Sequence, residues 1–314
     1  MKESTFNTNQ NSKSFIIILP FFNESELIID FLNLVTGKLQ NLNENFKLLF
    51  VNDGSTDNTE NLIKNHEIKS NNINIEIIEL NSNSGHQNAI RQGLIYVKSH
   101  YLNEIKAVII MDSDGEDNPD AISELIIKKD FDVVFVSRGQ RKESNLFKIS
   151  YYLYKILFKL ITGKHINFGN FSMISPKVLE AISDKHFFHY SSFLSKQKFK
   201  IDKIKYDRNK RLKGKSKMGF KNLLLHALKS LVEYHEELIY FQIKVFVIML
   251  IMFGSILSYI IYSKFISNTA VLGWSSSLFI GLINGLLIIF SSIIISTLLI
   301  TIKNTLDQKN IKIK

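Results

Sequence analysis

The chain has 314 residues, 45% of them hydrophobic, and a formal net charge of +10. This length accommodates one sizeable domain with an appendage, or two small domains. The chain contains no cysteine, which excludes disulfide bonds, thiolate metal sites and a cysteine nucleophile, and is consistent with a reducing compartment.

Strands and helices alternate along the first part of the chain. A polar, asparagine-rich tail at 1–14 lacks the apolar core of a signal peptide, so we expect the bulk of the protein to stay in the cytoplasm. Short apolar runs, typical of buried parallel strands, occupy 15–19, 47–51, 75–80 and 107–111. Helices are predicted at about 27–35, from about Thr59, and at 87–99. This alternation predicts an open, mostly parallel α/β sheet, whose ligands bind at the carboxyl ends of the strands.

An acidic stretch follows the fourth of these strands. Four carboxylates fall within six positions, at Asp112, Asp114, Glu116 and Asp117, and Pro119 ends the run. Oxygen ligands without Cys or His nearby favour a hard divalent cation such as Mg²⁺ or Mn²⁺, bound together with substrate phosphates. The alternative interpretation is a solvated acidic turn after a core strand.

The next segments carry cations. A fifth strand at 132–137 ends before Arg138 and Arg141, which are either ordinary surface charges or, on the rim of an acidic metal site, groups that hold a phosphate. Aromatic residues and lysines then alternate in an amphipathic helix at 146–161, which suits the bilayer interface or, alternatively, packs on the domain core. A loop and strand follow at 168–175, and Pro176 opens another helix.

The C-terminal third combines positive charge with long apolar runs. Between Lys196 and Lys221 there are twelve Lys or Arg and two Asp, a surface suited to anionic lipid more than to nucleic acid. An amphipathic helix leads from there to two uncharged runs, which we interpret as membrane spans near 243–263 and 277–302 in preference to buried core helices. Lysines after the second run predict that both chain ends face the cytoplasm.

Six motifs in this order resemble glycosyltransferase family 2 enzymes with a GT-A fold. The resemblance is to the polyprenyl-phosphate glycosyltransferases of the dolichol-phosphate mannosyltransferase type, in their bacterial form with two transmembrane helices, and it extends over about 15–230. The residues that carry it are Leu19–Glu24, Val51–Asp57, Asn83–Ala89, Met111–Pro119, Ser137-Arg138 with Arg141, and Arg211–Lys217.

The resemblance implies roles for particular residues. The nucleotide-sugar would be bound by Pro20, Asn23, Glu24, Asp53, Ser55 and Asp112. Asp114 and Glu116 would hold Mg²⁺ or Mn²⁺ on the diphosphate. The acceptor phosphate would be gripped by Arg138, Arg141, Arg211, Ser216 and Lys217, and the catalytic set would be Asp112, Asp114, Arg138 and Arg141.

This chain departs from the commoner family pattern at several positions. Glu116 stands where Gln is usual, which adds a carboxylate and should strengthen metal binding. Asn170-Phe171-Ser172 replaces Asp-Phe-Arg, and Pro176 replaces Arg, so the choice of donor or acceptor can differ from that of relatives. Met218 replaces a frequent Tyr, which we regard as minor.

The predicted organisation is a membrane-bound enzyme with a cytoplasmic catalytic domain. Its segments are a tail at 1–14, a GT-A domain at 15–220 with an interfacial helix at 145–163, a juxtamembrane helix at 221–242, spans at 243–263 and 277–302, and a basic cytoplasmic tail at 303–314. The expected reaction is inverting, metal-dependent transfer of a sugar from a UDP- or GDP-sugar to a polyprenyl phosphate, taken as undecaprenyl phosphate from the two-span layout. By the same resemblance a homotetramer is expected.

Three other functions are consistent with parts of this pattern. A processive polysaccharide synthase shares the fold, but the Gln-x-x-Arg-Trp motif is absent because the single tryptophan, Trp274, lies in the membrane region. A family 2 transferase with a different acceptor is a second alternative. A non-catalytic membrane scaffold with a degenerate transferase domain is the third, and the intact Asp112, Asp114 and Glu116 argue against it.

Overall fold

The computed structural model describes residues 13–68, 70–138, 145–163, 168–209, 228–266 and 273–311. The chain forms two compact units, one made of Met1–Asn145 and Ile166–His226 and the other of Leu146–His165 and Ala227–Lys314.

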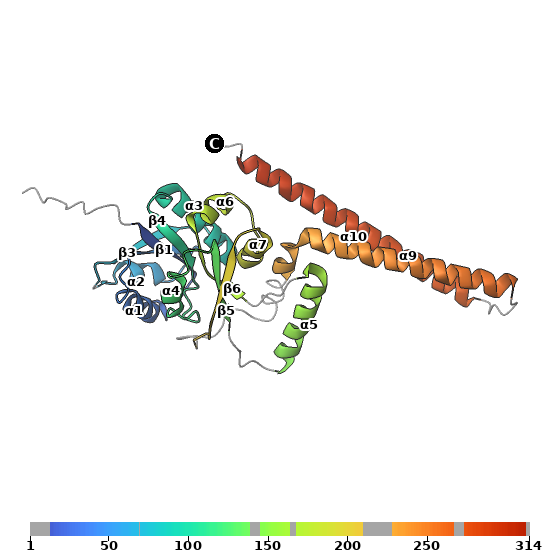
Figure 1. Ribbon diagram of the computed structural model, residues 1–314, viewed down its shortest axis with the longest axis horizontal. Coiled ribbons are helices and arrows are strands. Elements are labelled where there is room, and N and C mark those ends of the chain that lie inside the picture. Colours follow the sequence, from blue (N-terminus) through green and yellow to red (C-terminus); the bar gives the residue numbers. More distant parts are fainter. Residues whose placement is uncertain are drawn as a thin grey trace, which may run out of the picture. The chain divides into compact units, whose positions relative to one another are not determined.

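The first unit is built on one seven-stranded sheet in the order β3-β2-β1-β4-β6-β5-β7 (Figure 1). The strands are β1 (Ser14–Phe21), β2 (Phe46–Asn52), β3 (Ile73–Glu79), β4 (Ile105–Ile110), β5 (Val133–Arg138), β6 (Phe168–Ile174) and β7 (Ile201–Tyr206). Only β6 runs against its neighbours β4 and β5, and every other pairing is parallel. The predicted mostly parallel α/β sheet is therefore confirmed, with one reversed strand inside it.

Helices cover both faces of this sheet. They are α1 (Ile28–Leu39), α2 (Thr59–Lys64), α3 (His86–Tyr101), α4 (Ala121–Leu125), α6 (Pro176–Ile182) and α7 (Tyr190–Lys196). Alternate residues of β1 point to opposite faces, so Phe15 and Ile17 pack with α1 while Ile16 and Ile18 pack with α3. Each β1 residue from Phe15 to Leu19 is almost fully buried. Burial on both faces explains why the sequence of this strand is a continuous apolar run.

One strand of this unit, β7, lies where local patterns identify it poorly. β7 crosses the basic block that follows Lys196, and its Ile204 is buried against the sheet while lysines alternate on the other face. α6 begins as predicted at Pro176, and the side chain of Ser175 caps it by accepting a hydrogen bond from the Val178 N–H.

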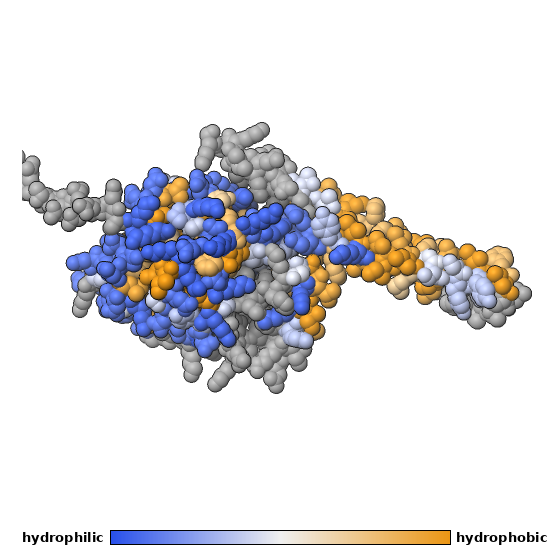
Figure 2. Space-filling view, in the orientation of Figure 1, coloured by the Kyte–Doolittle hydropathy of each residue, from blue (hydrophilic) through white to orange (hydrophobic). Residues whose placement is uncertain are grey.

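The second unit contains α5 (Asn145–Thr162), α9 (His235–Phe265) and α10 (Trp274–Ile311). α9, and Ser276–Leu299 within α10, are long and apolar enough to cross a membrane, with mean hydropathy of 2.4 and 2.6 and no buried residue in the most apolar window of either. Figure 2 shows the hydrophobic surface of these two helices in orange. They run antiparallel, since Phe246 meets Phe290 and Phe253 meets Phe279. α9 passes through the predicted boundary at 242 without interruption.

α5 packs within the second unit along one side. The Tyr154 hydroxyl pairs with Ser230 Oγ, and the Phe158 ring meets the Tyr234 ring edge-on at 5.2 Å between centroids. Several large apolar side chains of α5 are exposed, namely Tyr152, Leu153, Ile156, Leu157 and Leu160. The helix thus combines a packed stripe with an apolar face that the described residues do not cover.

Candidate functional site

The predicted site residues are gathered at one edge of the sheet. β1, β2, β4, β5 and β7 all end on this edge because they run in the same direction, and the reversed β6 begins there. Loops at the carboxyl ends of parallel strands form the usual ligand site of an open α/β sheet. The loops after β1, β2 and β4 and the residues after β7 thereby become neighbours in space.

Asn23 ties the loop after β1 to the loop after β2. Its backbone N–H donates to Ser55 Oγ at 3.0 Å, and its Oδ1 accepts from the N–H groups of Thr56 at 2.8 Å and Asp57 at 3.3 Å. Asn23 has a φ of 54°, a left-handed conformation that asparagine tolerates better than most residues. Asn23 and Ser55, both predicted to bind the nucleotide, therefore brace the two loops that would form its pocket.

Asp53 fixes the loop that leads into α3. It is 3% exposed, and its Oδ1 accepts from the Ser84 N–H at 2.8 Å and Ser84 Oγ at 2.9 Å, while Oδ2 accepts from the Gly85 N–H at 2.9 Å. These hydrogen bonds set the start of α3, whose first residue is His86. The role that the geometry gives Asp53 is to position this loop, whereas its predicted contact with the nucleotide stays a prediction.

The acidic loop after β4 is folded tightly by its own carboxylates. Asp117 Oδ2 accepts from the Asp112 N–H at 3.0 Å, and Asp114 Oδ1 accepts from the Glu116 N–H at 3.0 Å. Ser113 Oγ donates to the Pro20 carbonyl at 2.7 Å, which joins this loop to the end of β1. The loop is therefore ordered by its own hydrogen bonds and held to the end of β1.

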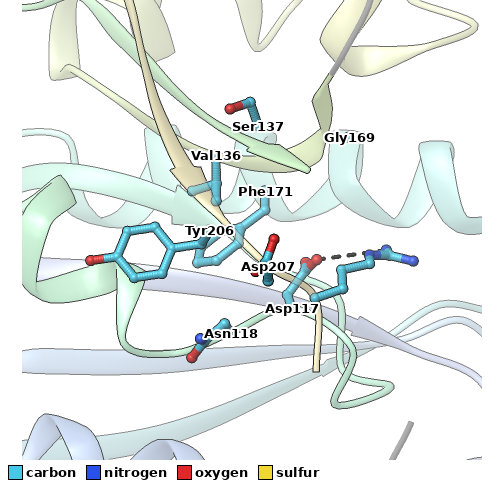
Figure 3. A pocket seen from close by; sticks show the side chains of 9 residues that line it. Asp117, Asn118, Val136, Ser137, Gly169, Phe171, Tyr206 and Asp207 are labelled. Atoms are coloured by element: carbon cyan, nitrogen blue, oxygen red, sulfur yellow. Dashed lines mark ion pairs between the residues drawn. The ribbon is translucent and has the colours of Figure 1, made fainter. Parts of the chain in front are cut away.

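Two basic side chains face these carboxylates. His86 Nε2 lies 3.1 Å from Asp112 Oδ1. Arg208, just after β7, forms an ion pair with Glu116, and one of its terminal nitrogens lies 3.6 Å from Asp117 Oδ1 and 3.7 Å from Asp112 Oδ2. Figure 3 marks the ion pair of Asp117 with a dashed line, beside a water-sized cavity of about 10 Å³.

The crowding of charge shifts the pKa values of these groups. Burial, together with the negative charges of Asp112 and Glu116, raises the pKa of Asp114 to about 6. Burial alone would lower the pKa of His86, but the neighbouring Asp112, Asp114 and Asp117 outweigh it and raise that pKa. The cluster thus carries more negative charge than its own cations neutralise.

A divalent cation fits this excess of charge. Among the described residues no three His, Asp or Glu side chains converge as a metal site. Mg²⁺ and related ions, however, are commonly held by one or two carboxylates and complete their coordination with substrate phosphates and water. Asp114, whose carboxylate is destabilised by its neighbours, is suited to such an ion, with Glu116 as the second predicted ligand.

Asn170 supports the site from the start of β6. It is 5% exposed, its Nδ2 lies 3.1 Å from His86 Nε2, and its Oδ1 accepts from Gln87 Nε2 at 3.4 Å. Gln87 Oε1 in turn accepts from the Tyr190 N–H at 2.6 Å. Ser172 is fully buried. Of the two family departures at 170 and 172, the first therefore lies at the site and the second lies in the core.

The structure brings together the predicted site residues whose side chains it describes. Those on the common edge are Pro20, Asn23, Glu24, Asp53, Ser55, Asp112, Asp114 and Glu116. Arg138 is the last residue of β5 and its backbone lies on the same edge, whereas the structure does not describe its side chain. Arg141, Arg211, Ser216 and Lys217 lie outside the described residues.

The sequence analysis assigned no individual role to three residues of this site, His86, Asp117 and Arg208, whereas it singled out Asn170 as a departure from the family pattern. The signal for His86 was its place in the Asn83–Ala89 motif, and that for Asp117 was the carboxylate run itself. Arg208 is one of twelve cations in the basic block, and nothing in its local sequence separates it from the others.

Comparison with known proteins identifies related sequences. The model of the family described as Glycosyl transferase family 2 matches residues 16–193. The uncharacterized glycosyltransferase YkcC of Bacillus subtilis (strain 168) is 26% identical over 289 residues, which cover 88% of this chain and 86% of that protein. An undecaprenyl-phosphate 4-deoxy-4-formamido-L-arabinose transferase of Shewanella sediminis (strain HAW-EB3) is 27% identical over 227 residues, covering 69% of this chain and 65% of that protein.

Solved structures share the fold. Glucosyl-3-phosphoglycerate synthase of Mycobacterium tuberculosis, solved with Mn²⁺, uridine diphosphate and phosphoglyceric acid, has a TM-score of 0.50 and 13% identity, covering 72% of this chain and 78% of its own. Mannosyl-3-phosphoglycerate synthase of Rubrobacter xylanophilus has a TM-score of 0.52 and 12% identity, covering 72% and 74%. At these identities the likeness establishes the fold alone, and it is the GT-A fold expected from the sequence.

Proposed function

The chain belongs to glycosyl transferase family 2, and from that premise we propose that it transfers a sugar from a UDP- or GDP-sugar to a polyprenyl phosphate at the cytoplasmic face of a membrane. Undecaprenyl phosphate is the lipid we would test first. The observation that carries the proposal is the carboxylate cluster at the carboxyl edge of the sheet, in a chain that also has two helices suited to spanning a bilayer.

The donor half of the reaction depends on the charge excess of that cluster. Asp114 and Glu116 would hold a divalent cation, which when bound acts as a Lewis acid and stabilises the negative charge of the departing diphosphate. Asn23 and Ser55 keep the loops after β1 and β2 in register, so the nucleotide would enter a preformed pocket. Asp112, held between His86 and Arg208, would face the sugar.

The acceptor half requires no strong base. A phosphate oxygen of a lipid phosphate is already anionic near neutral pH, so the protein's task is to bring two anions together in line. Arg138, at the end of β5 on the same edge, would contribute to this. The cations Arg141, Arg211 and Lys217 and the hydroxyl of Ser216, which lie outside the described residues, would hold the acceptor phosphate with it. We propose a single displacement with inversion at the anomeric carbon, which gives a polyprenyl-phosphate sugar.

The lipid nature of the acceptor is supported by two findings. One relative is named an undecaprenyl-phosphate sugar transferase. In the second unit, the exposed apolar face of α5 and the lysines at Lys155 and Lys159 suit the headgroup region of an anionic bilayer. We propose that α9 and α10 anchor the protein in the cytoplasmic membrane and that α5 lies in the interface.

The experiment that tests this function is a transfer assay with the purified full chain. The protein is incubated with undecaprenyl phosphate, Mn²⁺ or Mg²⁺ and a panel of UDP- and GDP-sugars, and lipid-linked product is followed by mass spectrometry. We expect product from one donor, and none when EDTA replaces the metal. A sample that binds nucleotide but forms no product with any donor would contradict the lipid acceptor and favour a different one.

A further inference from the structure

Arg208 is the arginine that lies against the carboxylate cluster after β4. Its guanidinium contacts Glu116, Asp117 and Asp112 from the end of β7, and its side chain is 18% exposed. Within the described residues Arg208 Nε is buried and has no hydrogen-bond partner. A guanidinium that faces three carboxylates and retains an unused N–H is poised to donate to a further anion.

The backbone after Arg208 is attached to the same acidic loop. The Asn209 N–H donates to the Glu116 carbonyl at 2.9 Å, so the chain leaves β7 directly beneath the carboxylates. The residues that follow, up to Lys217, include those proposed to grip the acceptor phosphate. The side chain of Arg208 and the backbone that follows it are therefore both bound to Glu116 of the acidic loop.

Arg208 and a divalent cation compete for the same charge. Two cations a few ångströms apart repel, and the repulsion is strong where water is largely excluded. Glu116 pairs with Arg208 and is also a predicted metal ligand, so its carboxylate cannot serve both partners equally. When a metal arrives with a nucleotide diphosphate, the phosphate oxygens provide a new partner that matches the planar guanidinium fork.

We propose that Arg208 is a positioning residue that neutralises the carboxylate cluster when no metal is bound and turns to the diphosphate of the donor when metal and nucleotide bind. This inference rests on the proposed function for the identity of the donor. Its consequence is that donor binding releases Arg208 from Glu116.

The first test measures the binding of Mn²⁺ to the full chain in the absence of nucleotide, with electron paramagnetic resonance as the readout. Arg208→Gln removes the competing charge, and we expect it to bind Mn²⁺ about ten-fold more tightly than the natural protein. A variant that merely damages the site would bind Mn²⁺ more weakly, so the sign of the change separates the two explanations. Unchanged or weaker Mn²⁺ binding by Arg208→Gln overturns the proposal.

Nucleotide binding at saturating Mn²⁺ tests the second half. We expect Arg208→Gln to bind UDP or GDP about ten-fold more weakly, because a bidentate contact to phosphate is lost. Arg208→Lys keeps the charge but lacks the fork, so it should bind Mn²⁺ as the natural protein does and still bind nucleotide more weakly. If Arg208→Gln does not fold, Arg208→Lys provides the test. An unchanged nucleotide affinity in Arg208→Lys would then overturn the proposal.

A matched control comes from the other end of β7. Lys128→Gln removes one cation from the pair that Lys128 forms with Asp202 at 2.6 Å, and it should leave Mn²⁺ and nucleotide binding unchanged. If the transfer assay gives no product but Arg208→Gln still binds Mn²⁺ more tightly than the natural protein, the proposed acceptor is contradicted and the role of Arg208 stands. Absence of Mn²⁺ binding by both the natural protein and Arg208→Gln, with or without nucleotide, overturns the inference itself.

Discussion

The loops after β1 and β2 and the loop after β4 lie on one edge of the sheet, but they are stabilised in opposite ways. In the first region each polar group meets a complementary one, as Asp53 does with two backbone N–H groups and a hydroxyl. In the second, carboxylates crowd together and the pKa of Asp114 is raised to about 6. The first region thus acts as a frame whose polar groups are hydrogen-bonded. In the second region the carboxylates repel one another, and a bound cation would reduce that repulsion.

The largest effect that separates the two regions is expected from Asp114→Asn. Loss of this carboxylate should lower the transfer rate by about 10³-fold or more, because charge on the departing diphosphate would no longer be stabilised. Folding should be unharmed, since the conflict with Asp112 and Glu116 is removed. Rate and thermal midpoint are measured together, and Asp120→Asn is the control because Asp120 pairs with Lys38 and does not face the cluster. Full activity in Asp114→Asn would refute the metal assignment.

Asp53→Asn should instead destabilise the frame formed by the loops after β1 and β2. An amide in place of the carboxylate turns an NH₂ group towards the N–H donors of Ser84 or Gly85, so at least one buried hydrogen bond is lost. We expect a loss of about 2–3 kcal/mol in the free energy of unfolding. Urea denaturation measures it, and a stability equal to that of the natural protein would show that the loop does not depend on Asp53.

Gly54→Ala should weaken the same frame to a smaller extent. Gly54 has a φ of +69°, and a Cβ added there would lie 2.7 Å from the Asn83 backbone nitrogen. A strained backbone of this kind costs about 1–3 kcal/mol. The denaturation midpoint should fall, and Gly37→Ala, at a helical glycine with nothing within 4 Å of its added Cβ, should not reduce stability. An unaffected midpoint in Gly54→Ala would show that the two loops can separate.

Asp114 should also make stability depend on pH, in the opposite sense to Asp57 in the loop after β2, whose pKa is lowered. Because the pKa of Asp114 is about 6 in the folded protein and 3.8 in the unfolded chain, folding takes up a proton between these pH values. The contribution of Asp114 to stability should therefore rise as pH falls from about 6 to about 4, by roughly 1.4 kcal/mol per unit at most. His86, whose pKa is also raised, adds stability at low pH that is lost as pH rises through its folded pKa.

Comparison with Asp114→Asn isolates this term. The difference in unfolding free energy between the two proteins should change with pH only across that window, and saturating Mn²⁺ should diminish the change because a bound cation favours the charged carboxylate. A difference that stays constant from pH 4 to pH 7 would mean that Asp114 is ionised throughout.

Much of the site could be foreseen from local sequence. Apolar runs marked β1 to β5, and the polar clusters behind them could be assigned to one edge because parallel strands end together. The carboxylate run at 112–117 followed from the same reasoning, whereas the particular roles of Asp112, Asp114 and Glu116 came from the resemblance to the family. The apolar length of α9 and α10 was equally visible, since it depends on composition alone.

Tertiary structure decided which groups meet across that edge. Arg208 reaches Glu116 over 92 residues of chain, and it does so only because β6 is reversed between β4 and β5 and β7 then pairs parallel with β5. Asp53 likewise became a brace for Ser84 and Gly85 through the packing of the loop after β3. Spacing along the chain encodes the elements because helix and strand periods are local, but it does not encode strand order or the pairing of charges, which depend on the register of the whole sheet.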